Sequence, residues 1–139
     1  MLRAKRLCAA LCLLCLASTA LAQDPRMIAV QSAARVWLAY VDRGDAQGAW
    51  KAAGKKFQGT LSLELWTAEL KKAQDGLGRV TQRTVGPVRF ESSFPGLPDG
   101  DYAQVLFRTS FEKKPGAGEV LTLEREADGQ WRVVGYFPR

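Results

Sequence analysis

The sequence predicts an α+β domain in which three helices precede a four-stranded antiparallel sheet. Before Gly78, apolar residues recur every three or four positions, as they do along the buried stripe of a helix. After Gly78, apolar and polar residues alternate, and turn segments rich in Gly, Pro and Asp separate the alternating stretches. Helices followed by consecutive strands are typical of α+β domains.

The first helix is expected over residues 25–43. Asp24 can accept hydrogen bonds from the free N–H groups of a helix start, and Pro25 suits the first helical position. Gly44 can end the helix, because glycine adopts the left-handed stop conformation at little cost. The apolar stripe consists of Met27, Val30, Ala34, Trp37, Leu38 and Val41.

Two further helices are expected. A short one begins at Asp45 and runs to about Ala53, where Gly54-Lys55-Lys56 ends it. The other is capped by Thr60 or Ser62 and is closed by Gly76 and Gly78. Its stripe consists of Leu63, Trp66, Leu70, Ala73 and Leu77.

Four strands are expected over residues 79–94, 102–112, 119–127 and 130–137. Gly86-Pro87 interrupts the first strand and indicates a bulge or an edge position. In the second strand Ala103, Val105, Phe107, Thr109 and Phe111 share one face. Asp128-Gly129 is typical of a two-residue hairpin turn between the last two strands.

This turn sets the register of the last two strands. It implies the pairs Gln130–Ala127, Trp131–Glu126, Arg132–Arg125, Val134–Leu123 and Tyr136–Leu121. One face then carries Leu121, Leu123, Val134 and Tyr136, and the other carries Val120, Thr122, Trp131, Val133 and Phe137. A sheet covered on one side should have one polar face. Either a bulge or register slip changes this pattern, or a second subunit covers the second face, which is the hypothesis of a homodimer.

Residues 1–22 have the three parts of a secretory signal. A basic start (Met1 to Arg6) precedes a short apolar run, and Ala20-Leu21-Ala22 provides a small-residue cleavage site. We therefore expect cleavage after Ala22, a single mature domain over 23–139 in the periplasm or outside the cell, and no stable membrane insertion. Lipid attachment at Cys15 is the alternative, although Leu14 is larger than the small residue that should precede such a cysteine.

Composition excludes several classes of chemistry. The chain has no histidine, and all three cysteines lie in the predicted signal. His-based acid–base catalysis, Cys-His nucleophiles and most zinc, copper or haem ligand sets are therefore excluded, and we expect no metal or cofactor. Loss of Arg3, Lys5 and Arg6 with the signal lowers the formal net charge from +6 to +3. The remaining charge of +3 is only weak support for a nucleic-acid partner.

The ordered set of short segments resembles the DUF4019 family of small exported bacterial proteins. The segments are Trp37-Leu38 with Asp42-x-Gly44, then Trp50, Trp66, Arg79, Arg83, residues 95–102, Phe107-Arg108-Thr109-Ser110-Phe111, Glu124 and residues 128–136. The resemblance implies a cystatin-like or nuclear-transport-factor-2-like cone, in which a curved sheet wraps around the helices. It implies no catalytic residues.

Cone folds often enclose a pocket between the first helix and the sheet. Our candidates for binding residues there are Tyr40, Asp42, Arg83, Arg108, Glu124, Trp131 and Tyr136. An Asp base and a Tyr donor could move protons next to a carbonyl group. The alternative is structural: Asp42 belongs to a turn, and Arg108 pairs with Glu124 across neighbouring strands.

The remaining aromatic and basic residues favour a structural role. Trp37 and Trp66 lie at helical spacing and are expected in the core, while Trp131 fits either a core or a ligand-stacking role. The pairs Lys55-Lys56, Lys71-Lys72 and Lys113-Lys114 are dispersed among acids, so we expect no nucleic-acid platform.

Together these observations favour an exported, non-catalytic module that binds a small molecule or a protein partner. The alternative is a cone-fold enzyme, an isomerase or lyase that uses Asp and Tyr on a small apolar substrate.

Overall fold

The computed structural model describes residues 23–139 and has the predicted α+β arrangement. Helices α1 (Pro25–Asp42), α2 (Ala46–Ala52), α3 (Lys55–Thr60) and α4 (Leu63–Leu77) precede four strands. The strands are β1 (Val80–Glu91), β2 (Tyr102–Phe111), β3 (Lys114–Arg125) and β4 (Trp131–Pro138), and every neighbouring pair is antiparallel. The predicted signal segment lies outside the described residues.

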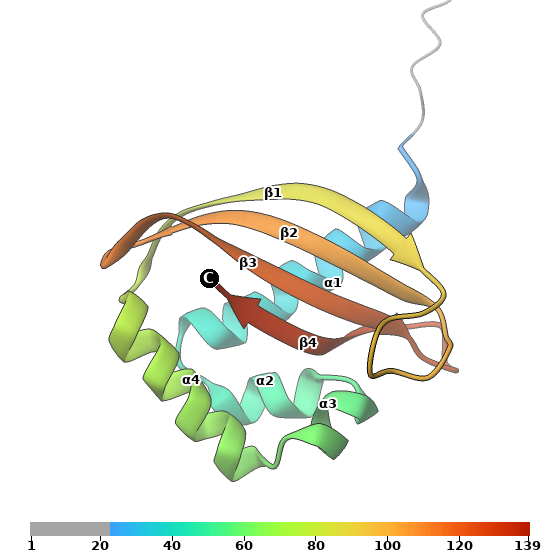
Figure 1. Ribbon diagram of the computed structural model, residues 1–139, viewed down its shortest axis with the longest axis horizontal. Helices are drawn as coiled ribbons and strands as arrows, with labels where there is room; N and C mark the ends of the chain where they lie inside the picture. Colours follow the sequence, from blue (N-terminus) through green and yellow to red (C-terminus); the bar gives the residue numbers. More distant parts are fainter. Residues whose placement is uncertain (1–22) are drawn as a thin grey trace, which may run out of the picture.

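The sheet curves over the helices, which all lie on its inner side (Figure 1). The core lies between these layers and contains Trp37, Leu38, Phe107, Leu121 and Leu123, each at most 2% exposed. No helix within residues 23–139 is long and apolar enough to cross a membrane.

The local signals for the two long helices are confirmed. The Asp24 carboxylate accepts a hydrogen bond from the Arg26 N–H, and Pro25 occupies the first turn of α1. Ser62 caps α4 by accepting from the Leu65 N–H at 3.1 Å. Gly78 follows α4 with φ +75° and ψ −167°, a region open almost only to glycine.

The short helix α3 covers residues that the sequence analysis assigned to the end of α2 and the following loop. Gly54 is its N-cap, with the extended values φ −71° and ψ 162°, and Phe57 is its one buried residue. The Gln58 amide donates to the Trp50 carbonyl at 2.9 Å and so caps the end of α2. A six-residue helix with one buried side chain is too short to show a 3.6-residue period, which is why it was missed.

The predicted register of the last hairpin is wrong near the turn and right further along. Glu126 and Gln130 pair through the Glu126 N–H, so the loop has three residues rather than two. Arg125 therefore faces Trp131, Glu124 faces Arg132 and Leu123 faces Val133, in place of the predicted pairs. A bulge at Val134 then restores the predicted Leu121–Tyr136 pair.

The three-residue loop also changes which residues face the core, and the bulge returns Tyr136 to that face. Val133 and Trp131 lie on the helix-covered face, where Val133 is 1% exposed and Trp131 packs against the core. The outer face of this hairpin keeps Val120, Thr122 and Phe137, of which Phe137 is 62% exposed. The second face is thus less apolar than the sequence analysis expected.

Candidate functional site

A buried polar network centres on Arg83 of β1. Its Nη1 and Nη2 donate to Oδ2 and Oδ1 of Asp42 at 2.6 and 2.8 Å. Its Nε and Nη2 also donate to Oε1 and Oε2 of Glu119 at 2.8 and 3.2 Å. One guanidinium therefore joins the end of α1 to β3, and the Arg83 side chain is only 16% exposed.

Glu119 is the most deeply buried member of this network, with no exposed surface. Besides Arg83, Thr109 of β2 donates to its Oε1 at 2.6 Å and Tyr136 of β4 donates to its Oε2 at 2.7 Å. Each carboxylate oxygen thus accepts two hydrogen bonds, which fills its usual acceptor capacity. Among the described residues no buried side-chain N or O atom lacks a hydrogen-bond partner, so the buried atoms of the network are satisfied without a ligand.

The surroundings fix the charge states of Arg83 and Tyr136. Burial alone would lower the pKa of Arg83, but hydrogen bonds to Asp42 and Glu119 outweigh burial and raise it. Burial raises the pKa of Tyr136 well above its usual range, and the negative charge of Glu119 adds to the rise. Arg83 is therefore a permanent cation and Tyr136 a neutral hydrogen-bond donor at any physiological pH.

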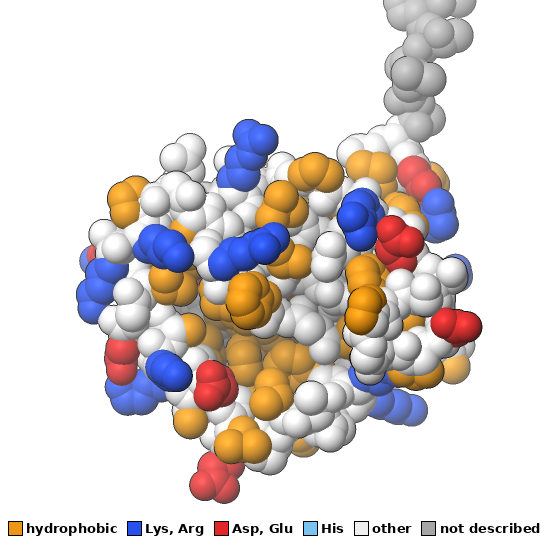
Figure 2. Space-filling view, viewed as in Figure 1, with side chains coloured by type: hydrophobic (Ala, Val, Ile, Leu, Met, Phe, Trp, Pro, Cys, Tyr) orange, Lys and Arg blue, Asp and Glu red, His pale blue; other side chains and the backbone are white. Residues whose placement is uncertain are grey.

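A cavity of about 270 Å³ lies beside this network, between α1, α4 and the sheet. Its apolar walls are formed by Val41, Leu70, Ala73, Leu77, Val80 and Phe111. Asp42, Gln74, Glu119 and Tyr136 supply polar surface, and Asp75, Gly78, Arg79, Glu112 and Lys113 complete the lining. Figure 2 shows a hollow between the sheet and the helical layer with hydrophobic side chains in its depth.

The chain places Asp42 at the cavity because α1 ends there. Gly44 turns the chain with φ +71°, so Asp42 is the last residue of the helix. A carboxylate at a helix C-terminus meets the negative end of the helix dipole, which is unfavourable on its own. Arg83 compensates for this position, and the Gln74 side chain of α4 donates to the Val41 carbonyl at 2.7 Å.

The family model for DUF4019, described as a protein family of unknown function, matches residues 33–136. The chain belongs to the DUF4019 family. The search of curated proteins finds no match.

Solved structures show the same fold at low sequence identity. A protein from Catenulispora acidiphila is 14% identical with a TM-score of 0.54, over 82% of this chain and 90% of that one. The protein Aln2 from a Streptomyces species is 15% identical with a TM-score of 0.53, over 84% of this chain and 92% of that one. At these identities the likeness concerns the fold alone.

The DUF4019 domain brings three of the seven predicted site residues together: Asp42, Arg83 and Tyr136. Tyr40 is half-buried, and its ring lies 4.3 Å from the Arg43 guanidinium carbon rather than in the cavity. Trp131 packs against Phe90, with ring centroids 6.0 Å apart.

Arg108 and Glu124 do not form the predicted ion pair. Arg108 is exposed on the outer face opposite Gly118, while Glu124 lies opposite Tyr102 at the other end of β2. Glu124 instead accepts a hydrogen bond from Lys56 of α3 at 2.5 Å.

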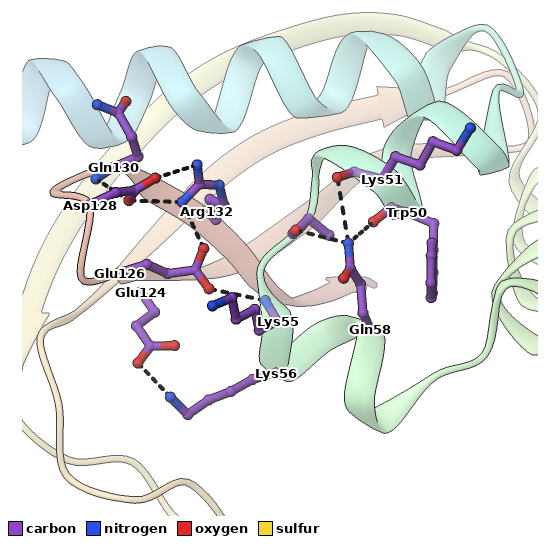
Figure 3. A network of polar contacts seen from close by, with 11 residues as sticks. Trp50, Lys51, Lys55, Lys56, Gln58, Glu124, Glu126, Asp128, Gln130 and Arg132 are labelled. Atoms are coloured by element: carbon purple, nitrogen blue, oxygen red, sulfur yellow. Dashed lines mark hydrogen bonds and ion pairs between the residues drawn. The ribbon is translucent and has the colours of Figure 1, made fainter.

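A second polar network fastens α3 to the tip of the β3–β4 hairpin (Figure 3). Glu126 accepts from the Lys55 N–H at 3.0 Å and from Arg132 at 2.8 Å. Arg132 also donates to both oxygens of Asp128. Because these groups bind one another and lie away from the cavity lining, we assign them, with Glu124, a structural role.

The tryptophan N–H groups are also used internally. Trp37 donates to the Ala49 carbonyl at 2.8 Å, and Trp66 donates to the Ala46 carbonyl at 3.0 Å. The rings of both are at most 4% exposed, so their predicted core position is confirmed.

Two members of the network, Glu119 and Thr109, are not among the site residues predicted from the sequence. The signal was present, because Glu119 has the same phase along β3 as the apolar Leu121 and Leu123. A charged residue in phase with core residues needs a buried partner. Residues 23–139 contain no group of three or more Asp, Glu, His or Cys side chains that could hold a metal ion.

Proposed function

We propose that this DUF4019 protein is an exported, non-catalytic module that binds a small molecule in the cavity between α1, α4 and the sheet. The observation that carries the proposal is the combination of apolar walls with a rigid polar side formed by Asp42, Glu119 and Tyr136. Protein sites for small molecules have this composition, and a cavity of about 270 Å³, just below their usual range of roughly 300–1,000 Å³, suits a ligand of few atoms.

The polar side of the cavity favours binding over proton transfer. An Asp–Tyr pair needs a tyrosine whose hydroxyl hydrogen can be given to the substrate. The Tyr136 hydroxyl hydrogen is directed to Glu119 at 2.7 Å and not into the cavity. An Asp–Tyr isomerase or lyase would have to break this contact before Tyr136 could donate a proton. An activity that disappears in Asp42→Asn would overturn the non-catalytic part of the proposal.

Export rests on residues 1–22 and has its own test. The intact mass of the protein from its natural host should correspond to a chain that begins at Gln23. A mass that includes a lipid on Cys15 would show envelope anchoring instead, and retention of Met1 would contradict export.

Binding is tested by mass spectrometry under native and denaturing conditions. The purified protein should carry a small molecule that is released on denaturation. The matched variant is Ala73→Phe, which adds a ring to a cavity-lining position of α4 and should leave the protein bare. A molecule that is retained by this variant lies elsewhere and would contradict the proposed site. A bare wild-type protein at twice the chain mass would favour the homodimer.

A further inference from the structure

The charges around the cavity do not balance. Arg83 is the one cation that contacts Asp42 and Glu119 in the described structure, so two carboxylates share a single guanidinium. Thr109 and Tyr136 add neutral hydrogen bonds only. Two carboxylates and one guanidinium give the network a formal charge of one negative unit beside an apolar cavity. Such a charge is costly away from water unless a cation joins it.

Two helix ends meet at the cavity. The C-terminal residues of α1 (Val41 and Asp42) and those of α4 (Gln74 and Leu77) line it. Each helix C-terminus corresponds to roughly half a negative charge. Arg43 and Lys113 donate to last-turn carbonyls of α1 and α4 and offset this charge, so the excess negative charge lies on the two carboxylates.

The other cations near the cavity, including Arg79 and Lys113 of its lining, are engaged by other groups. Arg79 is 87% exposed and pairs with Glu112. Lys113 is exposed and donates to the Asp75 carbonyl at 2.6 Å, while Arg43 donates to the Ala39 carbonyl at 3.1 Å and lies over Tyr40. None of these three side chains contacts Asp42 or Glu119 in the described structure.

We infer that the ligand of this cavity is an organic cation, a small amine with an apolar body, and this inference rests on the proposed function. The ammonium group contacts Asp42, whose side chain is 37% exposed and whose oxygens each accept only one hydrogen bond from Arg83. Glu119 acts through its charge and not by contact, because it is fully buried and its acceptor capacity is filled. The apolar body lies against Leu70, Leu77 and Phe111.

Three probes of similar size and different charge test this inference. Phenethylamine is a cation at neutral pH, phenethyl alcohol is neutral and phenylacetate is an anion. Binding is measured by isothermal titration calorimetry on the protein purified in its natural processed form. The amine should bind at least about tenfold more tightly than the alcohol. A tenfold difference in affinity corresponds to one modest charge contact. The anion should bind more weakly than the alcohol.

Asp42→Asn removes one negative charge and keeps an oxygen acceptor for Arg83. This variant should lose the preference for the amine over the alcohol. Its affinity for the alcohol should stay within about twofold of the wild-type value, and this result would show that the cavity is intact. The matched control is Asp101→Asn, which removes the same charge near the start of β2. Asp101 is an exposed residue 3.8 Å from Arg125, and its loss should leave all three affinities unchanged.

The outcomes separate the two proposals. Equal or tighter binding of the alcohol or the anion would overturn the inference of a cationic ligand and leave the cavity as a binding site. A preference for the amine that persists in Asp42→Asn would also overturn it. Failure of all three probes to bind, together with a bare protein in native mass spectrometry, would overturn the proposed function itself.

Discussion

Replacing Arg83 with methionine should destabilise the protein strongly, because the change leaves Glu119 charged and fully buried without a cation. Arg83 donates two hydrogen bonds to Glu119 and two to Asp42. Removing one partner of a buried ion pair costs about 3–5 kcal/mol. The Asp42 contacts add less, since that carboxylate is 37% exposed. For a domain of this size the loss corresponds to a fall in Tm of roughly 10–20 °C.

Urea unfolding followed by tryptophan fluorescence measures this loss, since Trp37 and Trp66 lie in the core. Arg108→Met is the matched control, because Arg108 is exposed on the outer face and its loss should change stability by no more than about 0.5 kcal/mol. Adding Glu119→Gln to Arg83→Met neutralises the isolated carboxylate and should recover about 2 kcal/mol. If Arg83→Met costs no more than the control, Glu119 is not a buried charge that depends on Arg83.

Three further predictions concern pH and backbone strain. Hydrogen bonds from Arg132 lower the pKa of Asp128 from 3.8 to about 2. The ionised Asp128 therefore stabilises the folded protein fully above pH 3.8, and this contribution is lost as the pH falls toward 2. Asp128→Asn should remove this acid-dependent part of Tm. The pKa of Tyr136 is raised, so the protonated Tyr136 stabilises the folded protein below about pH 10, and this contribution is lost at higher pH. Tyr136→Phe should reduce the fall in Tm at alkaline pH. An unchanged fall would contradict a role of the buried Tyr136 hydroxyl in stability. Gly78→Ala should cost more in urea unfolding than Gly129→Ala, although both glycines have positive φ, because only at Gly78 does an added Cβ approach another side chain, at 2.9 Å.

The elements that could be predicted from the sequence are those whose signals are local. Asp24, Pro25 and Gly44 mark the ends of α1, and Ser62 and Gly78 mark the ends of α4. The helix α3 lacks such a signal, because it depends on one buried side chain and on capping contacts with α2. The hairpin register was set one residue off near the turn, since Asp128-Gly129 fits both a two-residue and a three-residue loop.

The site was predicted in part for the same reason. Asp42, Arg83 and Tyr136 were found as polar residues in a family-like pattern, but their common partner Glu119 was not. Which residues meet across β1, β2, β3 and β4 depends on the register, and the bulge at Val134 cannot be seen in the sequence alternation. Arg108 does not belong to the site because it lies on the outer face, beside the buried Thr109, and Glu124 does not because it lies at the C-terminal end of β3, away from Glu119.

Amide NMR during titration with phenethylamine locates the binding surface of the protein. We expect the shifts to concentrate in the second half of α4, at Val80, at Phe111 and at Tyr136, which line the cavity. Shifts confined to Gln104, Val120 and Phe137 on the outer face of the sheet would contradict binding in the cavity and would make that face the binding surface.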